Sequence, residues 1–323
     1  MIAIFKNNLF INSLLLLVYT ALIRLNTLLN PVGYSASEDD TLLTKWIMSV
    51  FESPLSQSIV ALFLVYLQAV FINRVVIKHK LANEITLLPG LIYILFVSFL
   101  PGYLSLSPYL ITNTFVIISL NEMFKTYRRP KAANIIFNVG LCLGFSAIFV
   151  PEFIFLIPFV YICLYMMRSM GLKDFLQFIF GTIAVLFLYS GIAFLNDSSP
   201  FDLAKSLNLG LPLDVFSINK FGLYKLIGIL LLIIFAIFNY RNYTFKKSIQ
   251  AQRKVDILFW MLFSFGILFM ISGTIISEMV VLIFVPLAIF YNINFNNIKN
   301  PLIQESIHIV VILLLVLIHY NIL

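Results

Sequence analysis

The chain has 323 residues, of which 61% are hydrophobic and only 11% charged, and its mean hydropathy is +1.02. These values exclude an ordinary soluble globular domain and indicate an integral membrane protein. The net charge of +7 is dispersed over many short segments. This excludes a nucleic-acid-binding protein, because such proteins gather their basic residues on one surface.

Apolar segments recur along the whole chain between short polar connections. Each is about 20 residues long, enough to cross about 30 Å of hydrocarbon as an α-helix. We therefore predict one all-α, polytopic transmembrane domain over residues 1–323, a helical bundle of about eleven spans. If the pairs joined at Pro101-Gly102, Pro151-Glu152 or Gly273 are re-entrant, the count lies between about nine and eleven. The predicted spans are 9–29, 55–73, 86–104, 107–123, 134–149, 152–167, 174–195, 221–240, 255–272, 275–293 and 302–321.

The distribution of Lys and Arg predicts the orientation of this bundle. With the N-terminus in the cytoplasm, 16 of the 21 Lys and Arg residues fall on cytoplasmic segments. Because cytoplasmic loops retain positive charge, this asymmetry favours a cytoplasmic N-terminus over the inverse. The two longest polar segments, 30–54 and 196–220, are then the first and second outer loops.

The first outer loop carries three consecutive acids, Glu38-Asp39-Asp40. After them, apolar residues recur at intervals of three and four from Thr41 to Phe51, with Lys45 on the opposite side. This spacing predicts an amphipathic helix in the membrane interface, with Ser37 or Asp39 as its N-cap. Either the acids only stabilise the positive end of this helix, or the helix fixes them at the outer surface for chemistry. The residues of the apolar face are Leu42, Leu43, Trp46, Ile47, Val50 and Phe51.

Four other residues are candidates for a site on the outer side. Glu152 and Glu278 lie near the outer ends of their spans, where a carboxylate faces a cavity or reaches the interface. Lys205 and Lys220, in the second outer loop, break the predicted charge asymmetry. They are either phosphate ligands or part of a solvated loop.

The order of these features resembles the opening of the GT-C class of membrane glycosyltransferases, which includes protein O-mannosyltransferases and aminoarabinose lipid transferases. The likeness covers about the first 200 residues. It includes the span 107–121, the basic turn Tyr127-Arg-Arg-Pro-Lys131 and a span bearing Gly140-x-x-x-Gly144.

The chain departs from the class in two ways. It has Thr112-Asn113-Thr114 where such enzymes often place an acid near the start of the fourth span, and it shows no large C-terminal outer domain. The chain is also similar in style to polytopic inner-membrane proteins of Bacteroidota.

The resemblance implies transfer of a sugar from a polyprenyl-phosphate donor to an acceptor on the outer face of a bacterial inner membrane. Asp39 or Asp40 would then be the general base and Glu38 its helper. The donor phosphate would be bound by Arg24, Lys45, Lys205 or Lys220. Adjacent carboxylates could also hold a divalent metal, which some members of the class use and others do not.

Two other functions are compatible with the sequence. A non-catalytic membrane subunit that scaffolds an envelope assembly for secretion, motility or biogenesis would explain why familiar catalytic motifs are missing. Its partners would be envelope proteins in addition to the lipid bilayer. A transporter is less consistent with the chain, since it would require broken helices related by an internal repeat, and no convincing repeat is present.

Overall fold

The computed structural model describes residues 2–37, 40–199, 202–207, 220–245, 247–271 and 276–319. Within these ranges all regular secondary structure is helical, which confirms the predicted all-α class. The elements are α1 (Ile2–Phe5), α2 (Phe10–Ile23), α3 (Leu25–Leu29), α4 (Leu42–Val50), α5 (Pro54–Lys78), α6 (Leu88–Ser98), η1 (Pro101–Tyr103), α7 (Pro108–Lys125), α8 (Ala133–Phe149), η2 (Pro151–Leu156), α9 (Ile157–Met167), α10 (Leu172–Leu195), α11 (Asp202–Lys205), α12 (Lys220–Phe238), α13 (Tyr240–Thr244), α14 (Ile249–Ile271), α15 (Ile276–Asn296) and α16 (Pro301–His319).

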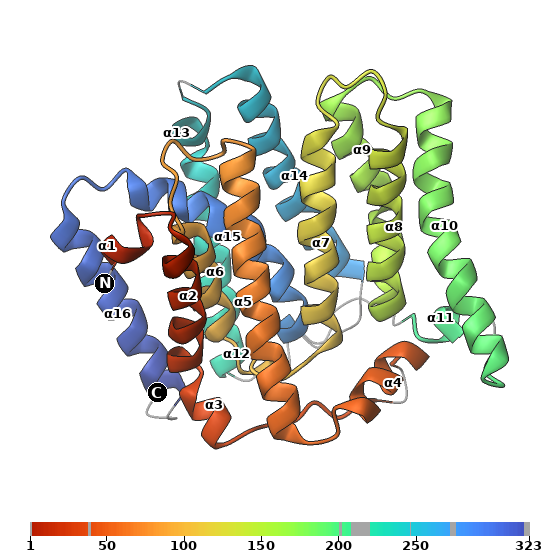
Figure 1. Cartoon of the computed structure of the whole chain (residues 1–323), viewed down its shortest axis with the longest axis horizontal. Coiled ribbons are helices and arrows are strands. Elements are labelled where there is room, and N and C mark those ends of the chain that lie inside the picture. Colours follow the sequence, from red (N-terminus) through yellow and green to blue (C-terminus); the bar gives the residue numbers. More distant parts are fainter. Residues whose placement is uncertain are drawn as a thin grey trace.

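The long helices form one antiparallel bundle, in which successive helices run in alternate directions (Figure 1). At one end lie α13 and the connections that follow α5, α7 and α9. At the other lie α3, α4 and α11. We call these the basic end and the α4 end, because the segments predicted to be cytoplasmic, with most of the Lys and Arg residues, gather at the first.

Each predicted span contains a helix at the predicted position. Among the described residues, two helices, α5 and α10, are long and apolar enough to cross a membrane, and several others are apolar but shorter. The predicted helix positions are therefore confirmed. That each helix crosses a bilayer stays a prediction.

Ser-Pro pairs start two of the helices that carry the polar interior. Ser53 caps α5, and its Oγ accepts a hydrogen bond from the backbone N–H of Ser56 at 3.1 Å. Ser107 caps α7 in the same way, accepting from the N–H of Leu110 at 3.3 Å. In both helices proline takes the first position, where its missing N–H costs no hydrogen bond and its fixed φ suits the helix.

Glycines bring the backbones of α8 and α10 into direct contact. A Cβ on Gly140 would lie 2.1 Å from the carbonyl oxygen of Phe178, and one on Gly181 would lie 2.4 Å from the carbonyl oxygen of Phe137. The Thr182 hydroxyl donates across the contact to the Gly140 carbonyl at 3.1 Å. Small residues at four-residue spacing permit this close helix packing, as in membrane helix pairs.

At the basic end, a buried lysine ties the end of α5 to α14. Lys254 Nζ donates to His79 Nδ1 at 3.3 Å, and His79 Nε2 donates to Asn121 Oδ1 at 3.1 Å. These roles require the neutral His79 tautomer with its proton on Nε2. Burial is the largest cause that lowers the pKa of His79 to about 4. The hydrogen bond to Asn121 raises this pKa, whereas neighbouring positive charges, Lys254 first, lower it further.

This histidine gives a testable pH dependence. The His79 pKa is about 4 when folded and about 6.5 when unfolded, so the unfolded chain binds more protons between these pH values. Stability from this group is therefore complete above about pH 6.5 and is lost as the pH falls toward 4, by up to about 3 kcal/mol. We expect Tm, followed by fluorescence in detergent, to fall between pH 7 and pH 4.5, and His79→Asn to flatten this fall. An identical pH profile for the variant would contradict the assignment.

Candidate functional site

The side chain of Arg24 lies inside the bundle at its α4 end. Arg24 separates α2 from α3, and only 1% of the residue is exposed. Its Nε donates a hydrogen bond to the hydroxyl of Ser98, the last residue of α6, at 3.4 Å. Its Nη1 and Nη2 atoms are buried and have no hydrogen-bond partner in the described part of the chain. The two terminal nitrogens of this guanidinium are therefore held in the interior without an acceptor among the described residues.

A chain of hydrogen bonds between α5, α6 and α7 lies close to this guanidinium. Tyr93 is near enough to interact electrostatically with Arg24, and its hydroxyl donates to Gln68 Oε1. Asn113 Nδ2 donates to the Tyr93 oxygen at 2.6 Å, and Gln68 Nε2 donates to Thr114 Oγ1 at 2.8 Å. We call Arg24, Gln68, Tyr93, Ser98, Asn113 and Thr114 the Arg24 network.

The Arg24 network leaves both charge and hydrogen-bonding capacity unsatisfied. An uncompensated buried cation is unfavourable by several kcal/mol. Asn113 Oδ1 and, next to it in the chain, Thr112 Oγ1 are also buried and have no partner in the ranges that the structure describes. Because buried polar atoms are rarely left unpaired, such a group indicates a ligand-binding interior. A guanidinium binds phosphate or carboxylate through paired N–H groups, so the arrangement suits an anion.

Asp40, the described member of the acidic triplet, is engaged in its own loop. Its carboxylate accepts hydrogen bonds from the Tyr34 hydroxyl at 3.0 Å and from the Ser37 N–H at 2.8 Å. Gln57 of α5 holds this loop in place, since its Oε1 accepts from the Tyr34 N–H at 2.6 Å and its Nε2 donates to the Phe51 carbonyl at 3.0 Å. Asp40 and Arg24 therefore bind different partners. Glu38 and Asp39 lie outside the described residues.

The predicted helix after the acids is α4, but its predicted N-cap is wrong. The N-cap is Thr41, whose Oγ1 accepts from the Thr44 N–H, because Ser37 and Asp39 are too far upstream for a helix that starts at Leu42. The Leu42 N–H bonds the Tyr189 hydroxyl of α10 at 3.1 Å. Part of the predicted apolar face, Trp46 and Val50, is exposed. The buried positions are Thr44 and Met48, while Leu43 and Ile47 pack partly against the core.

The structure separates the predicted phosphate-binding cations. Lys45 is exposed on α4, and Lys205 is exposed at the end of α11. Lys220 begins α12, and its side chain lies outside the described part of the structure, as does that of Glu278 in α15. Glu152 is buried at the start of η2. Among the predicted cations with a described side chain, only Arg24 is placed in the interior.

No metal site is present in the described ranges, where no three His, Cys, Asp or Glu side chains gather. A metal at the acidic triplet stays a prediction, since Glu38 and Asp39 are not described.

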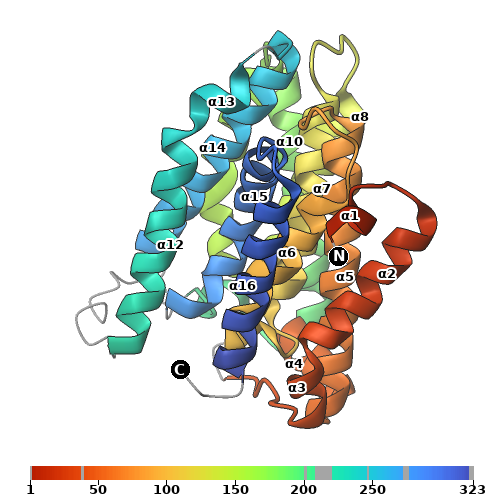
Figure 2. The ribbon, with the colours of Figure 1, turned by 90° about the vertical axis from the view of Figure 1, so that its left-hand side faces the viewer.

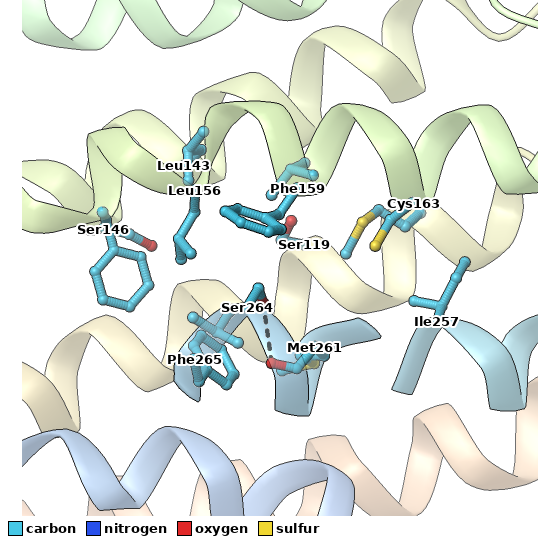
Figure 3. A pocket seen from close by; sticks show the side chains of 14 residues that line it. Ser119, Leu143, Ser146, Leu156, Phe159, Cys163, Ile257, Met261, Ser264 and Phe265 are labelled. Atoms are coloured by element: carbon cyan, nitrogen blue, oxygen red, sulfur yellow. Dashed lines mark hydrogen bonds between the residues drawn. The ribbon is translucent and has the colours of Figure 1, made fainter. Parts of the chain in front are cut away.

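An apolar cavity between α7, α8, α9 and α14 is too small to hold a lipid-linked substrate (Figure 3). Its volume is about 50 Å³, which is room for a few water molecules and far below the roughly 300 Å³ at which ligand pockets begin. Two of its hydroxyls bond their own helices: Ser264 donates to the Met261 carbonyl at 2.9 Å, and Ser146 donates to the Cys142 carbonyl at 2.9 Å. The side chain of Cys163 also lines this cavity.

The sequence analysis missed three members of the Arg24 network, Gln68, Tyr93 and Ser98, because it searched for groups that are charged at neutral pH. The available signal was Gln68, a primary amide inside the otherwise apolar stretch of α5 from Ile59 to Ile72. A side chain of this kind inside an apolar span tends to face a partner helix.

A family model described as "Family of unknown function (DUF6427)" matches residues 42–323. The chain belongs to this family. The DUF6427 match begins at the first residue of α4 and thus includes Gln68, Tyr93 and Asn113, while Arg24 and Asp40 lie in the segment before it. No curated protein and no solved structure matches the chain.

Proposed function

We propose that this DUF6427 protein is a multi-pass membrane protein of about eleven spans, with a cytoplasmic N-terminus in a bacterial inner membrane. What supports the bilayer placement is that polar groups lie inside the bundle and large apolar side chains lie outside it. On α10, exposed apolar residues recur at helical spacing from Leu176 to Leu195, a stripe about 28 Å long. This length suits a hydrocarbon core of about 30 Å. The members of the stripe are Leu176, Phe180, Ile183, Phe187, Leu188, Ile192, Phe194 and Leu195.

Within the bilayer, we propose that Arg24 binds the phosphate of a polyprenyl-phosphate sugar donor. The observation that carries this proposal is the buried guanidinium whose two terminal nitrogens lack an acceptor in the described chain. Arg24 directly precedes α3, which lies at the α4 end, the outer face in the proposed orientation, and the exposed Val18 and Leu22 of α2 would face the polyprenyl chain. Asn113 and Thr112 supply unpaired acceptors for a sugar hydroxyl.

The reaction we propose is sugar transfer of the GT-C kind. An acceptor hydroxyl attacks the anomeric carbon, the bond from that carbon to the phosphate oxygen breaks, and polyprenyl phosphate leaves. Asp39 or Asp40 takes the proton of the hydroxyl, Glu38 assists, and Arg24 stabilises the negative charge that grows on the leaving phosphate.

The second candidate function is a non-catalytic scaffold. It is favoured by the engagement of the Asp40 carboxylate with Tyr34 and Ser37, which accounts for this acid without chemistry.

Binding of polyprenyl phosphate tests the proposal directly. We expect the wild-type protein in detergent to retain polyprenyl phosphate in native mass spectrometry and to discriminate against the polyprenol of equal length. Arg24→Gln should weaken retention at least tenfold, about 1.4 kcal/mol, because the phosphate loses its buried counter-ion. Lys205→Gln removes one exposed charge from the same end and is the matched control, with no expected change.

Equal retention of the polyprenol and its phosphate, or equal loss in both variants, would refute phosphate binding at Arg24. If phosphate binds but no glycosylated product depends on Arg24 in cells with normal protein abundance, the site is a binding site on a scaffold.

A further inference from the structure

A second, larger cavity opens at the basic end of the bundle, away from the Arg24 network. It has a volume of about 340 Å³ and lies between the start of α2 and the end of α5. Its polar wall is formed by Asn8, Ser13, Asn73, Arg74 and Lys78, and the rest is apolar. Figure 2 shows that α2 is an outer helix of the bundle, beside α5. The cavity therefore lies at the periphery.

No acidic side chain in the described part of the structure pairs with the cations of this cavity. Arg74 and Lys78 are exposed and four residues apart on α5, so both lie on one face of the helix. Neither makes an ion pair with another residue in the described ranges. Two adjacent cations at a cavity mouth attract a group with more than one negative oxygen, such as a phosphodiester flanked by polar head-group atoms.

Asn73 lines the same wall and joins it to α6. The residue is 2% exposed, and its Oδ1 accepts a hydrogen bond from the Gly90 N–H at 2.7 Å. This bond fixes the amide, while Nδ2 is buried without a partner among the residues described. A Cβ on Gly90 would lie 2.6 Å from Nδ2, so this amide packs against α6, and the cations at the cavity mouth are the groups that select the ligand.

An apolar surface continues from the cavity along α2. Phe10 is 80% exposed, Ile11 68% and Leu14 49%, and they begin where Asn8 and Ser13 line the cavity. The surface thus combines a basic pocket with an adjacent apolar strip that runs toward the opposite end. A free phosphate would use only the pocket, whereas a glycerophospholipid would use both parts.

We propose that this cavity binds the head group of an anionic glycerophospholipid, with its acyl chains along α2. The lipid comes from the leaflet at the basic end, so this proposal rests on the membrane placement in the proposed function but not on Arg24 or on catalysis. Basic pockets between membrane helices on the cytoplasmic side bind anionic head groups for the same electrostatic reason.

The experiment compares two lipids that share acyl chains. The purified full chain is titrated with phosphatidylglycerol or phosphatidylcholine, and bound lipid is counted by native mass spectrometry. We expect at least fivefold preference for phosphatidylglycerol, and loss of that preference in the double variant Arg74→Gln/Lys78→Gln. Both side chains are exposed, so the variant is expected to fold. The matched control is Arg129→Gln/Lys131→Gln, which removes the same charge from another exposed connection at the basic end.

Three outcomes would overturn the lipid assignment. The control could lose the preference equally, which would mean general attraction to a basic surface. Inorganic phosphate at millimolar concentration could displace the lipid completely, which would identify free phosphate as the ligand. The wild-type protein could show no preference between the lipids. Polyprenyl phosphate retention by Arg24 is measured separately, so failure of one proposal is distinguishable from failure of the other.

Discussion

Replacement of Gly140 by leucine is expected to abolish the folded protein. A Cβ there would lie 2.1 Å from the Phe178 carbonyl oxygen, which belongs to the backbone of α10 and cannot move aside alone. Leucine would force α8 and α10 apart and break the bond from Thr182 to the Gly140 carbonyl. Overpacking of a close helix contact costs about 1–3 kcal/mol or more, and here the whole interface separates. Gly181→Leu should have the same effect, since its Cβ would meet the Phe137 carbonyl at 2.4 Å.

Fluorescence-detected size-exclusion chromatography of tagged protein in detergent measures this effect as loss of the monodisperse peak. Gly191→Leu is the matched control on α10, because nothing lies within 4 Å of a Cβ at Gly191 and the residue is exposed. A normal peak for Gly140→Leu, or equal loss in the control, would show that the glycine contact does not hold the two helices together.

Arg24→Met is expected to stabilise the ligand-free protein while it removes phosphate binding. The guanidinium is buried, and two of its nitrogens have no partner among the described residues, so its removal relieves a desolvation penalty. Methionine has a similar length and leaves no cavity. Exchange of buried charges for apolar side chains is often stabilising by about 1–4 kcal/mol. A purely structural arginine would give the opposite sign, since its loss would destabilise the fold.

Thermal unfolding of delipidated protein in phosphate-free buffer checks the sign. We expect a higher Tm for Arg24→Met and no gain for Arg24→Lys, which keeps the charge. Addition of polyprenyl phosphate should then raise the Tm of the wild-type protein but not that of Arg24→Met. A lower Tm for Arg24→Met without ligand would mean that the guanidinium serves packing alone.

Helix positions were predictable because apolar length and Ser-Pro starts are local signals. Ser53-Pro54 and Ser107-Pro108 mark the first turns of α5 and α7 in the printed sequence. The cap of α4 was mispredicted because five consecutive hydroxyl or carboxylate residues, 37–41, precede the helix, and only the observed start at Leu42 selects Thr41. The alternation of the predicted spans likewise predicted which connections share one end of the bundle (Figure 1), whereas the orientation predicted from the Lys and Arg distribution stays a prediction.

The candidate site was predictable only in part. Arg24 was predicted as a phosphate ligand from the resemblance to the GT-C class and its place on the predicted outer side, but its burial against Ser98 depends on how α6 packs, which no local pattern encodes. Asn113 was noted because it stands where the resembled enzymes place an acid, and its bond to Tyr93 appears only in the folded bundle. The roles of Glu38, Asp39 and Asp40 as base and helper stay predictions.

The glycine contact between α8 and α10 also has a consequence for biosynthesis. The two helices are not consecutive, since η2 and α9 lie between them in the chain. At translation rates of about 5–20 residues per second, the glycine face of α8 remains open for several seconds before α10 is made. During this interval α8 is exposed to any other helix with a small-residue face. Until α10 is made, α8 is therefore open to mispairing through its glycines, and a chaperone would protect it during this interval.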